Sequence, residues 1–406
     1  MSGDPFADNR RLVAVFAVTM STGFIAMSQA LPVALIPISE SLDVSRAAVT
    51  AATSISTLVG AAVAFPVGRL LDRHGGRWIM TVGSAIGVLS IVLWSQATSL
   101  THLYLAFAAM GLGTAMCTYE AAFAVLVVAS DPSRRDRSIL TVTMIAGLST
   151  YLVYPPLGWL VSELGWRHTL LVLAGLMLVT SVPGHLWSIP DRATHVRRVR
   201  ARASVSVRVA LRQRRFWLLA IAFVGQAAAT SAVLLLVFSY LLDVGHSLAV
   251  ASTIPMAVGL LQILSRLALT TFARRLPLAT AAAGAFAIQG IGLLALPLVG
   301  LSIPLTFLCV SAVGLANGVS VIARPSILAD TFGAAQFASI MAAIVVPMAL
   351  ARAGAPLVAA WLADWRFLVA GGVVSLGASA ALLPLVPRRR RGGSADAVTG
   401  EAVLAR

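Results

Sequence analysis

The stretch Gly68-Arg-Leu-Leu-Asp-Arg-His-Gly-Gly-Arg77 places three arginines and an aspartate between two long apolar segments. A charged decapeptide in this position predicts a short turn that joins two membrane helices. Gly68 allows two helices to approach closely, and Gly75 and Gly76 supply the backbone angles of a tight turn. We expect Asp72 to accept hydrogen bonds from the N-terminus of a neighbouring helix, where the helix dipole favours a carboxylate.

The chain as a whole is too apolar for a soluble protein. Its 406 residues are 59% hydrophobic and 11% charged, whereas about a quarter of the residues in a soluble domain are charged. A helix needs about 20 apolar residues to span a bilayer, so we predict twelve transmembrane helices in two sets of six. The first set is 11–38, 46–68, 78–97, 101–130, 138–162 and 166–189. The second set is 214–242, 248–271, 277–299, 303–329, 337–362 and 365–386.

The arginines set the expected orientation. The chain has 30 basic residues, all arginine. With both termini inside, 24 of them lie in cytoplasmic segments and three in outside segments. The positive-inside rule therefore predicts a multi-pass protein of the inner (plasma) membrane with both termini cytoplasmic. The net charge of +15 comes from short loops, so we expect no nucleic-acid partner.

The two sets of predicted helices repeat each other. The fifth reads Pro155-Pro-Leu-Gly-Trp-Leu-Val-Ser-Glu-Leu-Gly-Trp-Arg167, and the eleventh reads Ala355-Pro-Leu-Val-Ala-Ala-Trp-Leu-Ala-Asp-Trp-Arg366. One gap aligns both the Pro-Leu and the Trp-Arg pairs. Gly314-Leu-Ala in the tenth helix similarly matches Gly111-Leu-Gly in the fourth, and Ser265-Arg266-Leu267 matches Gly68-Arg69-Leu70 without the aspartate. The agreement of polar and aromatic positions favours an internal duplication over chance matching.

The charged decapeptide resembles the signature loop between the second and third helices of the major facilitator superfamily. The family pattern is Gly, three residues, Asp, a basic residue, one residue, Gly and then a basic pair. Gly76 departs from this pattern, because a basic residue is usual there. The positions that match, and that the resemblance identifies as the gating or signature loop, are Gly68, Asp72, Arg73, Gly75 and Arg77.

The resemblance covers residues 10–387 and implies an all-α integral membrane protein. Its twelve transmembrane helices form two pseudo-symmetric six-helix halves, with a small-molecule substrate bound between them near mid-membrane. We expect it to be a monomer surrounded by membrane lipid. The expected parts are a cytoplasmic N-terminus (1–10), an N-terminal half (11–189), a basic cytoplasmic linker (190–213), a C-terminal half (214–386) and a cytoplasmic tail (387–406). The linker is expected either as a basic helix on the inner lipid surface or as a solvated connection.

Three charged residues inside the predicted spans are the main site candidates. A charge in a spanning helix usually lines a cavity and has a partner. Glu120 is the acid deep in a span, and Arg324 nearly matches its position in the repeat. Arg352 lies in the middle of the eleventh span, a placement similar to that of basic residues in the oxalate/formate and monocarboxylate groups of the superfamily. Glu120 is expected either to exchange a proton and face the substrate or to form a static pair with an arginine.

Other polar residues inside the spans are weaker candidates, because such side chains also form hydrogen bonds between helices. Those expected to shape the pocket are Tyr119, Tyr151, Tyr154, Gln29, Gln226 and Asn317. Arg266 lies about 27 Å along its helix at 1.5 Å per residue. We therefore expect it to extend toward the cytoplasmic surface.

The motifs favour a carrier over an enzyme. The chain has no phosphate-binding loop of the Gly-x-x-x-x-Gly-Lys type, and its six histidines show no metal-ligand spacing. We therefore expect no enzymatic activity, no cofactor and no metal, with energy drawn from a gradient. Cys117 and Cys309 lie inside apolar spans, where they are expected to pack as small side chains.

The expected function is secondary active transport by alternating access of a small solute, either an organic anion or another metabolite, coupled to protons. The alternative is a proton-driven drug or toxicant efflux antiporter. Such antiporters carry an arginine four residues before the glycine of the fourth span, where this chain has Phe107 before Gly111. They also carry Gly-Pro-x-x-Gly-Gly in the fifth span, where this chain has Tyr154-Pro155-Pro156-Leu157-Gly158. A non-transporting receptor or scaffold is a third possibility, which the charges inside the membrane argue against.

Overall fold

The computed structural model describes residues 5–194, 196, 205–272, 277–362 and 365–386, and every described element is helical apart from turns and one isolated bridge residue. The predicted tail (387–406) and residues 1–4 of the predicted N-terminus lie outside the described residues. Ten described segments are long and apolar enough to cross a membrane, and α7 and α12 bring the number of spans to twelve. The predicted all-α fold of twelve transmembrane helices is therefore confirmed.

The first six spans are built from nine helical segments. The first span is α1 (Pro5–Phe24), the π-helical turn η1 (Ile25–Gln29) and α2 (Ala30–Ser41); the second and third are α3 (Arg46–His74) and α4 (Gly76–Ser95). The fourth is α5 (Leu100–Cys117) with α6 (Tyr119–Ala129). The fifth and sixth are formed by α7 (Pro132–Leu152) and α8 (Tyr154–Ser188). Within α8 the backbone of Gly165 is non-helical, with φ 74°, and this residue separates the fifth span from the sixth.

The second six spans follow the short helix α10 (Val207–Arg212). They are α11 (Arg214–Asp243), α12 (Leu248–Phe272), α13 (Leu278–Val299), α14 (Ile303–Phe332), α15 (Phe337–Leu362) and α16 (Arg366–Leu382), which ends in the 3-10 turn η2 (Leu383–Leu385). These helices are largely continuous, whereas the first half is interrupted at η1, Thr118, Val153 and Gly165. Among the described residues, the helices of the first half are therefore interrupted more often than those of the second half.

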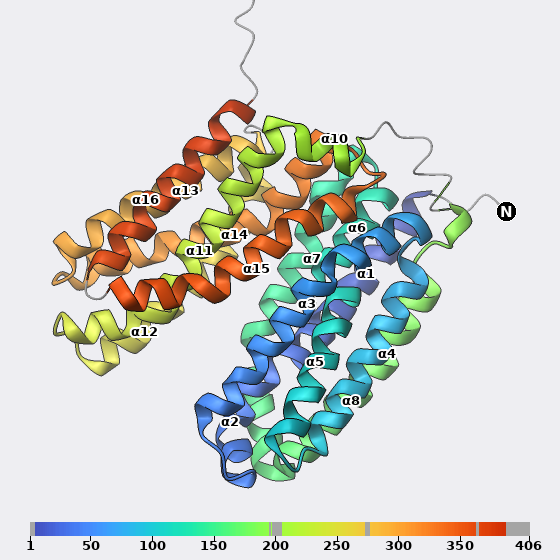
Figure 1. Ribbon diagram of the computed structural model, residues 1–406, viewed down its shortest axis with the longest axis horizontal. Helices are drawn as coiled ribbons and strands as arrows, with labels where there is room; N and C mark the ends of the chain where they lie inside the picture. The colour runs from blue at the N-terminus through green and yellow to red at the C-terminus, as the bar shows by residue number, and fades with distance from the viewer. Residues whose placement is uncertain (1–4, 195, 197–204, 273–276, 363–364, 387–406) are drawn as a thin grey trace, which may run out of the picture.

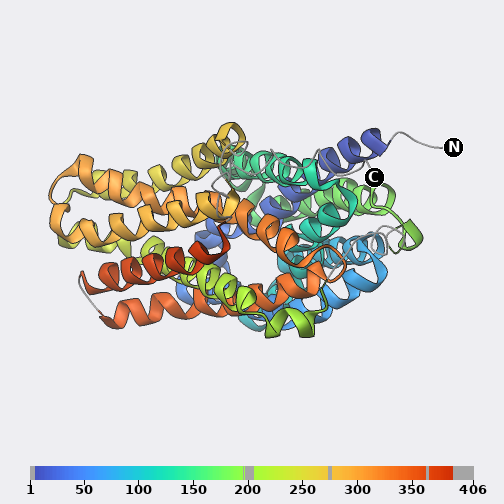
Figure 2. The same ribbon diagram turned by 90° about the horizontal axis from the view of Figure 1, so that it is seen from above.

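The two halves are arranged as two groups of helices that meet along α3 and α15. Figure 2 shows the blue-to-green helices of the first half on one side and the yellow-to-red helices of the second half on the other. They converge at the end that carries α10 and diverge toward α2 and α12 (Figure 1). The closest pairing across the halves is α3 with α15, and α7 packs in the same way against α12 and α14.

Close glycine packing repeats in both halves, as the sequence repeat predicts. A Cβ atom on Gly111 of α5 would overlap the Ser56 carbonyl group of α3, and one on Gly314 of α14 would overlap the Val258 carbonyl group of α12. The helix pairs α3·α5 and α12·α14 are thus equivalent. Because only glycine allows this approach, the two positions fix how tightly α3 is held against α5 and α12 against α14.

Candidate functional site: a charged cavity between the two halves

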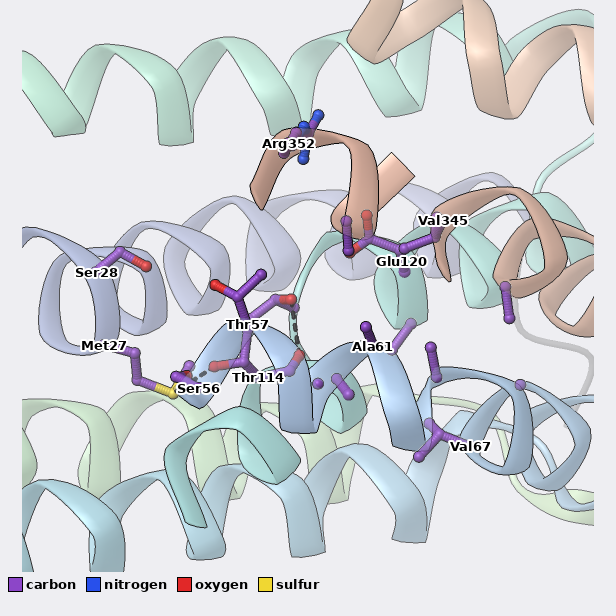
Figure 3. Close-up of a pocket in the computed structure, with 18 of the residues that line it drawn as sticks. Met27, Ser28, Ser56, Thr57, Ala61, Val67, Thr114, Glu120, Val345 and Arg352 are labelled. Atoms are coloured by element: carbon purple, nitrogen blue, oxygen red, sulfur yellow. Dashed lines mark hydrogen bonds between the residues drawn. The ribbon is translucent and has the colours of Figure 1, made fainter. Parts of the chain in front are cut away.

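A cavity of about 330 Å³ lies between the halves. The first half contributes η1, α2, α3, α5 and α6, and the second half contributes α15 (Figure 3). Its polar wall consists of hydroxyl side chains and two charged groups; these residues are Ser28, Thr53, Ser56, Thr57, Thr114, Thr118, Glu120 and Arg352. The rest of the wall is apolar, so a ligand here would meet hydroxyls, one carboxylate and one guanidinium in an otherwise hydrophobic pocket.

The wall of the cavity is exposed at one end and buried at the other. Wall residues at one end, including Ser28, Thr53 and Arg352, are exposed, whereas Gly68 and Ala338 at the other end are buried. The closed end is the one that contains the charged decapeptide. With the orientation predicted from the arginines, this conformation would open to the outside, which remains a prediction.

Glu120 reaches the cavity because its helix is broken. Thr118 adopts an extended conformation (φ −99°, ψ −157°), which ends α5 and makes Tyr119 the first residue of α6. Glu120 therefore lies in the first turn of α6, where the helix dipole stabilises a carboxylate. Its side chain is 39% exposed. The sequence predicted a charged residue deep in a span but not this break, because no proline or glycine marks it.

Arg324 pairs with Glu120 across the two halves. Its Nη2 atom donates to the Glu120 Oε1 atom at 3.3 Å, and its Nη1 atom lies 3.2 Å from the Met348 Sδ atom. The arginine side chain is only 8% exposed. The pair links α6 to α14. Because a buried guanidinium strongly destabilises a protein when its partner is removed, Arg324 needs an acidic or anionic neighbour.

Arg352 is the second cation of this region. It lies on α15, lines the cavity and is exposed (Figure 3). Its charge also acts on Arg324. The sequence-based grouping of Glu120, Arg324 and Arg352 is therefore reproduced in space. Substrate contact by any of them remains a prediction.

The remaining candidates lie in different surroundings. Tyr119 packs between Phe24 and Phe123, with ring centroids 6.1 and 5.6 Å away. Gln29 donates its Nε2 hydrogen to the Tyr154 hydroxyl at 2.8 Å, so these two candidates partner each other. Tyr151 lies in α7, and its side chain is outside the described part of the structure.

Gln226 and Asn317 form hydrogen bonds within the second half. The Gln226 amide donates to the Thr230 hydroxyl at 2.9 Å. The Asn317 amide donates to the Gln262 Oε1 atom at 3.1 Å and so connects α14 to α12. Neither residue belongs to the wall of the charged cavity. The Asn317 bond matches the alternative that such side chains join helices, whereas the Gln226 bond lies within α11. A substrate contact for either residue stays a prediction.

The charged decapeptide closes one end of the cavity. The Asp72 carboxylate accepts hydrogen bonds from the Ala338 N–H (3.0 Å), the Ser339 N–H (2.9 Å) and the Ser339 hydroxyl (2.5 Å). Both N–H groups belong to the first turn of α15, so Asp72 contacts a helix N-terminus as expected. A Cβ atom on Gly68 would lie 2.8 Å from the Ala338 carbonyl oxygen, which explains the need for glycine there.

The turn itself is shorter than the decapeptide indicates. α3 ends at His74, and Gly75, with φ 77°, is the single residue before α4 begins at Gly76. Arg73 is exposed, and Arg77 lies in the first turn of α4. Gating by these residues is a prediction that follows from the contact between Asp72 and α15.

A second contact between the halves lies at the same end and was missed by the sequence analysis. The Arg135 Nη2 atom of α7 donates to the Asp330 Oδ1 atom of α14 at 2.7 Å, and its Nε atom donates to Asp136 at 3.2 Å. The arginine-rich loop indicated only orientation, and Asp330 lies one residue beyond the predicted tenth span. The position of Asp330, a charged residue immediately after an apolar span, was the one feature of the sequence that could have indicated this contact.

Arg266 differs from its expected position. Instead of extending to the surface it is buried, and its Nη1 atom donates to the Thr143 carbonyl oxygen of α7 at 2.9 Å. The reason is that α12 packs against α7, so the predicted outward face of this helix is covered. Arg266 thus joins the two halves where Gly68 and Asp72 do so in the first copy of the repeat.

Comparison with known proteins agrees with this architecture. Residues 14–311 match the Major Facilitator Superfamily. A 124-residue region is 33% identical to human monocarboxylate transporter 12, covering 30% of this chain and 23% of that protein. A 115-residue region is 33% identical to monocarboxylate transporter 13 of Rattus norvegicus, covering 28% and 26%. The chain thus spans about a quarter of the length of these relatives.

Solved structures share the fold over nearly the whole chain. The human organic anion transporter MFSD10 (TETRAN) has a TM-score of 0.70 at 17% identity and covers 92% of this chain and 99% of its own. A proton:xylose symporter, XylE, has a TM-score of 0.72 at 14% identity, with 95% and 97% covered. At such low identity these likenesses show the fold alone. The match over residues 14–311 shows that this chain belongs to the Major Facilitator Superfamily, and its long apolar helices make it a multi-pass membrane protein.

Proposed function

We propose that this protein is a secondary active carrier that moves a small organic anion together with a proton by alternating access. The observation that carries the proposal is the Glu120–Arg324 pair with Arg352 beside it, at a cavity between two six-helix halves. Ionised groups inside a membrane protein mark substrate and ion pathways. A cavity closed at one end by Asp72 and open at the other is what alternating access requires.

The charges favour an anion. Glu120 offsets one arginine, so the three groups leave a net charge of about +1 in a region of low dielectric constant. An arginine also offers a planar pair of donors that fits a carboxylate. The volume of about 330 Å³ lies at the small end of ligand sites, and six hydroxyl-bearing residues lie on its otherwise largely apolar wall. A small monocarboxylate with an apolar or hydroxylated body fits this description.

The relatives are consistent with this substrate class. Two of them are named monocarboxylate transporters, and one structural neighbour is an organic anion transporter. Two further neighbours, the xylose and fucose carriers, are proton symporters. A lipophilic cation, the typical cargo of the alternative drug antiporter, would be repelled by Arg352 and by Arg324. The charge of the cavity therefore favours the anion carrier over the antiporter.

The same geometry suggests how a proton and an anion are coupled. Protonation of Glu120 removes the negative charge that faces Arg324, so the guanidinium loses its ionic partner. The carboxylate of the substrate then replaces Glu120 as the partner of Arg324, with Arg352 as a second donor. Among the described residues, the charged and titratable groups near Glu120 include Arg324, Arg352 and Tyr119, and the charge of Arg266 also acts on Tyr119. Proton and anion would therefore bind together and cross in the same direction.

The test is a transport screen in proteoliposomes with and without a pH gradient. We expect a small monocarboxylate such as lactate to accumulate on the alkaline side, and oxalate, xylose and tetraphenylphosphonium to move much more slowly. Arg352→Gln should reduce monocarboxylate uptake at least tenfold, because one charge-assisted pair contributes about 1.5 to 3 kcal/mol. The matched control is Arg46→Gln, an exposed arginine at the start of α3. Uptake of tetraphenylphosphonium without lactate uptake would refute the proposal and favour the antiporter.

A further inference from the structure

The short helix α10 presents an unusual combination of side chains to its surroundings. Arg208 and Arg212 are exposed, and between them Val209 and Leu211 are 50% and 37% exposed. The segment from residue 205 to residue 217 contains no acidic residue. A helix of six residues that exposes both arginines and aliphatic side chains is poorly suited to water alone.

Trp217, in the first turn of α11, extends the same face. Its side chain is 56% exposed, and its indole Nε1 atom donates to the Leu211 carbonyl oxygen at 2.9 Å. This bond holds the indole ring against the end of α10. We define the α10 surface as Arg208, Val209, Leu211, Arg212, Arg214 and Trp217, all of them exposed. Tryptophan and arginine together are typical of the membrane–water interface.

The α10 surface lies at the membrane boundary because α11, which begins two residues after α10, is itself a spanning helix. Basic side chains there attract anionic lipid headgroups, and apolar side chains enter the headgroup region. An acidic peptide or a nucleic acid would pair with the arginines but would leave the apolar side chains of Val209 and Leu211 in contact with water. The chemistry therefore favours an anionic phospholipid headgroup.

The preceding backbone ties α10 to the turn between α14 and α15. The Val205 N–H donates to the Phe332 carbonyl oxygen at 3.0 Å, and the Val207 N–H donates to the Gln336 Oε1 atom at 2.7 Å. Residues 333–336 form this turn, and α15 starts immediately after it. Asp72 caps the N–H groups at the start of α15 from the first half. One turn is thus held by α10 on one side and by the opposite half on the other.

We propose that anionic phospholipid headgroups bind the α10 surface and thereby hold the turn between α14 and α15 in the position that Asp72 caps. Lipid bound in this way stabilises the conformation in which the halves are closed at this end. Because α10 contacts both α11 and α15, a displacement of the turn during opening moves α10 as well. A headgroup that binds only one position of α10 shifts the equilibrium toward that position.

The test measures amide hydrogen exchange in the full-length protein, in nanodiscs of pure phosphatidylcholine or of phosphatidylcholine with phosphatidylglycerol. We expect phosphatidylglycerol to slow exchange in residues 205–212 and in residues 332–340. A basic residue near an anionic surface changes affinity by about fivefold, so the double variant Arg208→Gln/Arg212→Gln should lower the protection by up to about 25-fold. The matched control, Arg46→Gln at the opposite end of the molecule, should retain the full effect.

Unchanged exchange in α13 shows that the double variant is folded. Equal exchange in the two lipids, or slowing that persists in the double variant, would overturn the proposal. Slowing confined to residues 205–212, with residues 332–340 unaffected, would overturn the link to the turn. Protection by an acidic peptide in pure phosphatidylcholine that equals the effect of phosphatidylglycerol would overturn the assignment to lipid.

Discussion

Replacing Glu120 with glutamine removes a charge from the cavity and leaves its shape almost unchanged. Glutamine keeps the Oε1 acceptor that receives the Arg324 Nη2 hydrogen at 3.3 Å. At that distance two unit charges attract by about 5 kcal/mol at an effective dielectric constant of about 20. Because the Glu120 side chain is 39% exposed, solvent weakens this attraction. We therefore expect Glu120→Gln to weaken the interaction with Arg324 by about 1 to 3 kcal/mol, a value between those of exposed and buried ion pairs.

Whether the affinity for the anion rises or falls with pH depends on which protonation state of Glu120 frees Arg324. In the proposed mechanism a proton on Glu120 frees the guanidinium, so the affinity of the wild type for the anion should rise as the pH falls. One proton bound with each anion changes the affinity for the anion by at most about tenfold per pH unit. The glutamine variant resembles the protonated carrier at every pH. Its affinity should equal that of the wild type at low pH and should not fall as the pH rises.

The assay compares two kinds of transport in proteoliposomes. In counterflow, where labelled substrate exchanges for unlabelled substrate without a pH gradient, Glu120→Gln should be active. In uphill uptake driven by a pH gradient, it should accumulate nothing. Glu120→Asp keeps a titratable group and should restore part of the gradient-driven uptake. The matched control is Glu163→Gln, which makes the same substitution at an exposed position of α8.

Two results would refute this reasoning. Gradient-driven accumulation by Glu120→Gln that equals the wild type would place proton coupling elsewhere. A lower unfolding temperature with an unchanged pH dependence of transport would mean that Glu120 and Arg324 form only the static link between helices that the sequence left open. The thermal measurement therefore separates a role in coupling from a role in packing.

Three further predictions concern the contacts that close and brace the cavity. Asp72→Asn keeps one oxygen acceptor but loses the charge that strengthens three hydrogen bonds. The contact between α3 and α15 should therefore weaken by about 1 to 3 kcal/mol. A cysteine introduced at Ala342 should then react at least fivefold faster with a hydrophilic thiol reagent. Asp330→Asn should have a much smaller effect in the same assay, below about 1 kcal/mol, because the Asp330 side chain is 62% exposed. Gly111→Ala should lower the unfolding temperature, with a loss of about 1 to 3 kcal/mol from overpacking, whereas Gly158→Ala should not, since a Cβ atom there meets nothing within 4 Å.

The spans could be predicted from the sequence because each depends on local composition. An apolar run of sufficient length must form a helix in lipid, since its backbone polar groups have no other partners there. The predicted 337–362 coincides with α15, and the predicted 46–68 falls short of the end of α3 only because residues 69–74 are charged or flanked by charge. The repeat also placed Arg324 near Glu120, since equivalent positions of the two halves face each other across the cavity.

The partners of these residues could not be predicted in the same way. Asp72 and Ser339 are separated by 267 positions, and nothing in the local sequence of either one identifies the other. The helix break at Thr118 and the π-helical turn at Ile25–Gln29 also lack a proline or glycine inside them. Both depend on how neighbouring helices pack, which a single sequence does not encode locally. Arg266 was placed wrongly for the same reason, because its exposure depended on α7.

The two copies of the repeat join the halves at this end by different chemistry. In the first copy an anion, Asp72, caps the start of α15, and in the second a cation, Arg266, donates to a carbonyl group within α7. A capped helix N-terminus presents N–H groups with no competing partner in their own helix, whereas the Thr143 carbonyl belongs to a helix interior. Separation of the halves would leave the Asp72 carboxylate and the Ala338 and Ser339 N–H groups without these hydrogen bonds. We infer that the Asp72 contact limits opening at this end, and that the α10 surface acts on the contact where the barrier is set.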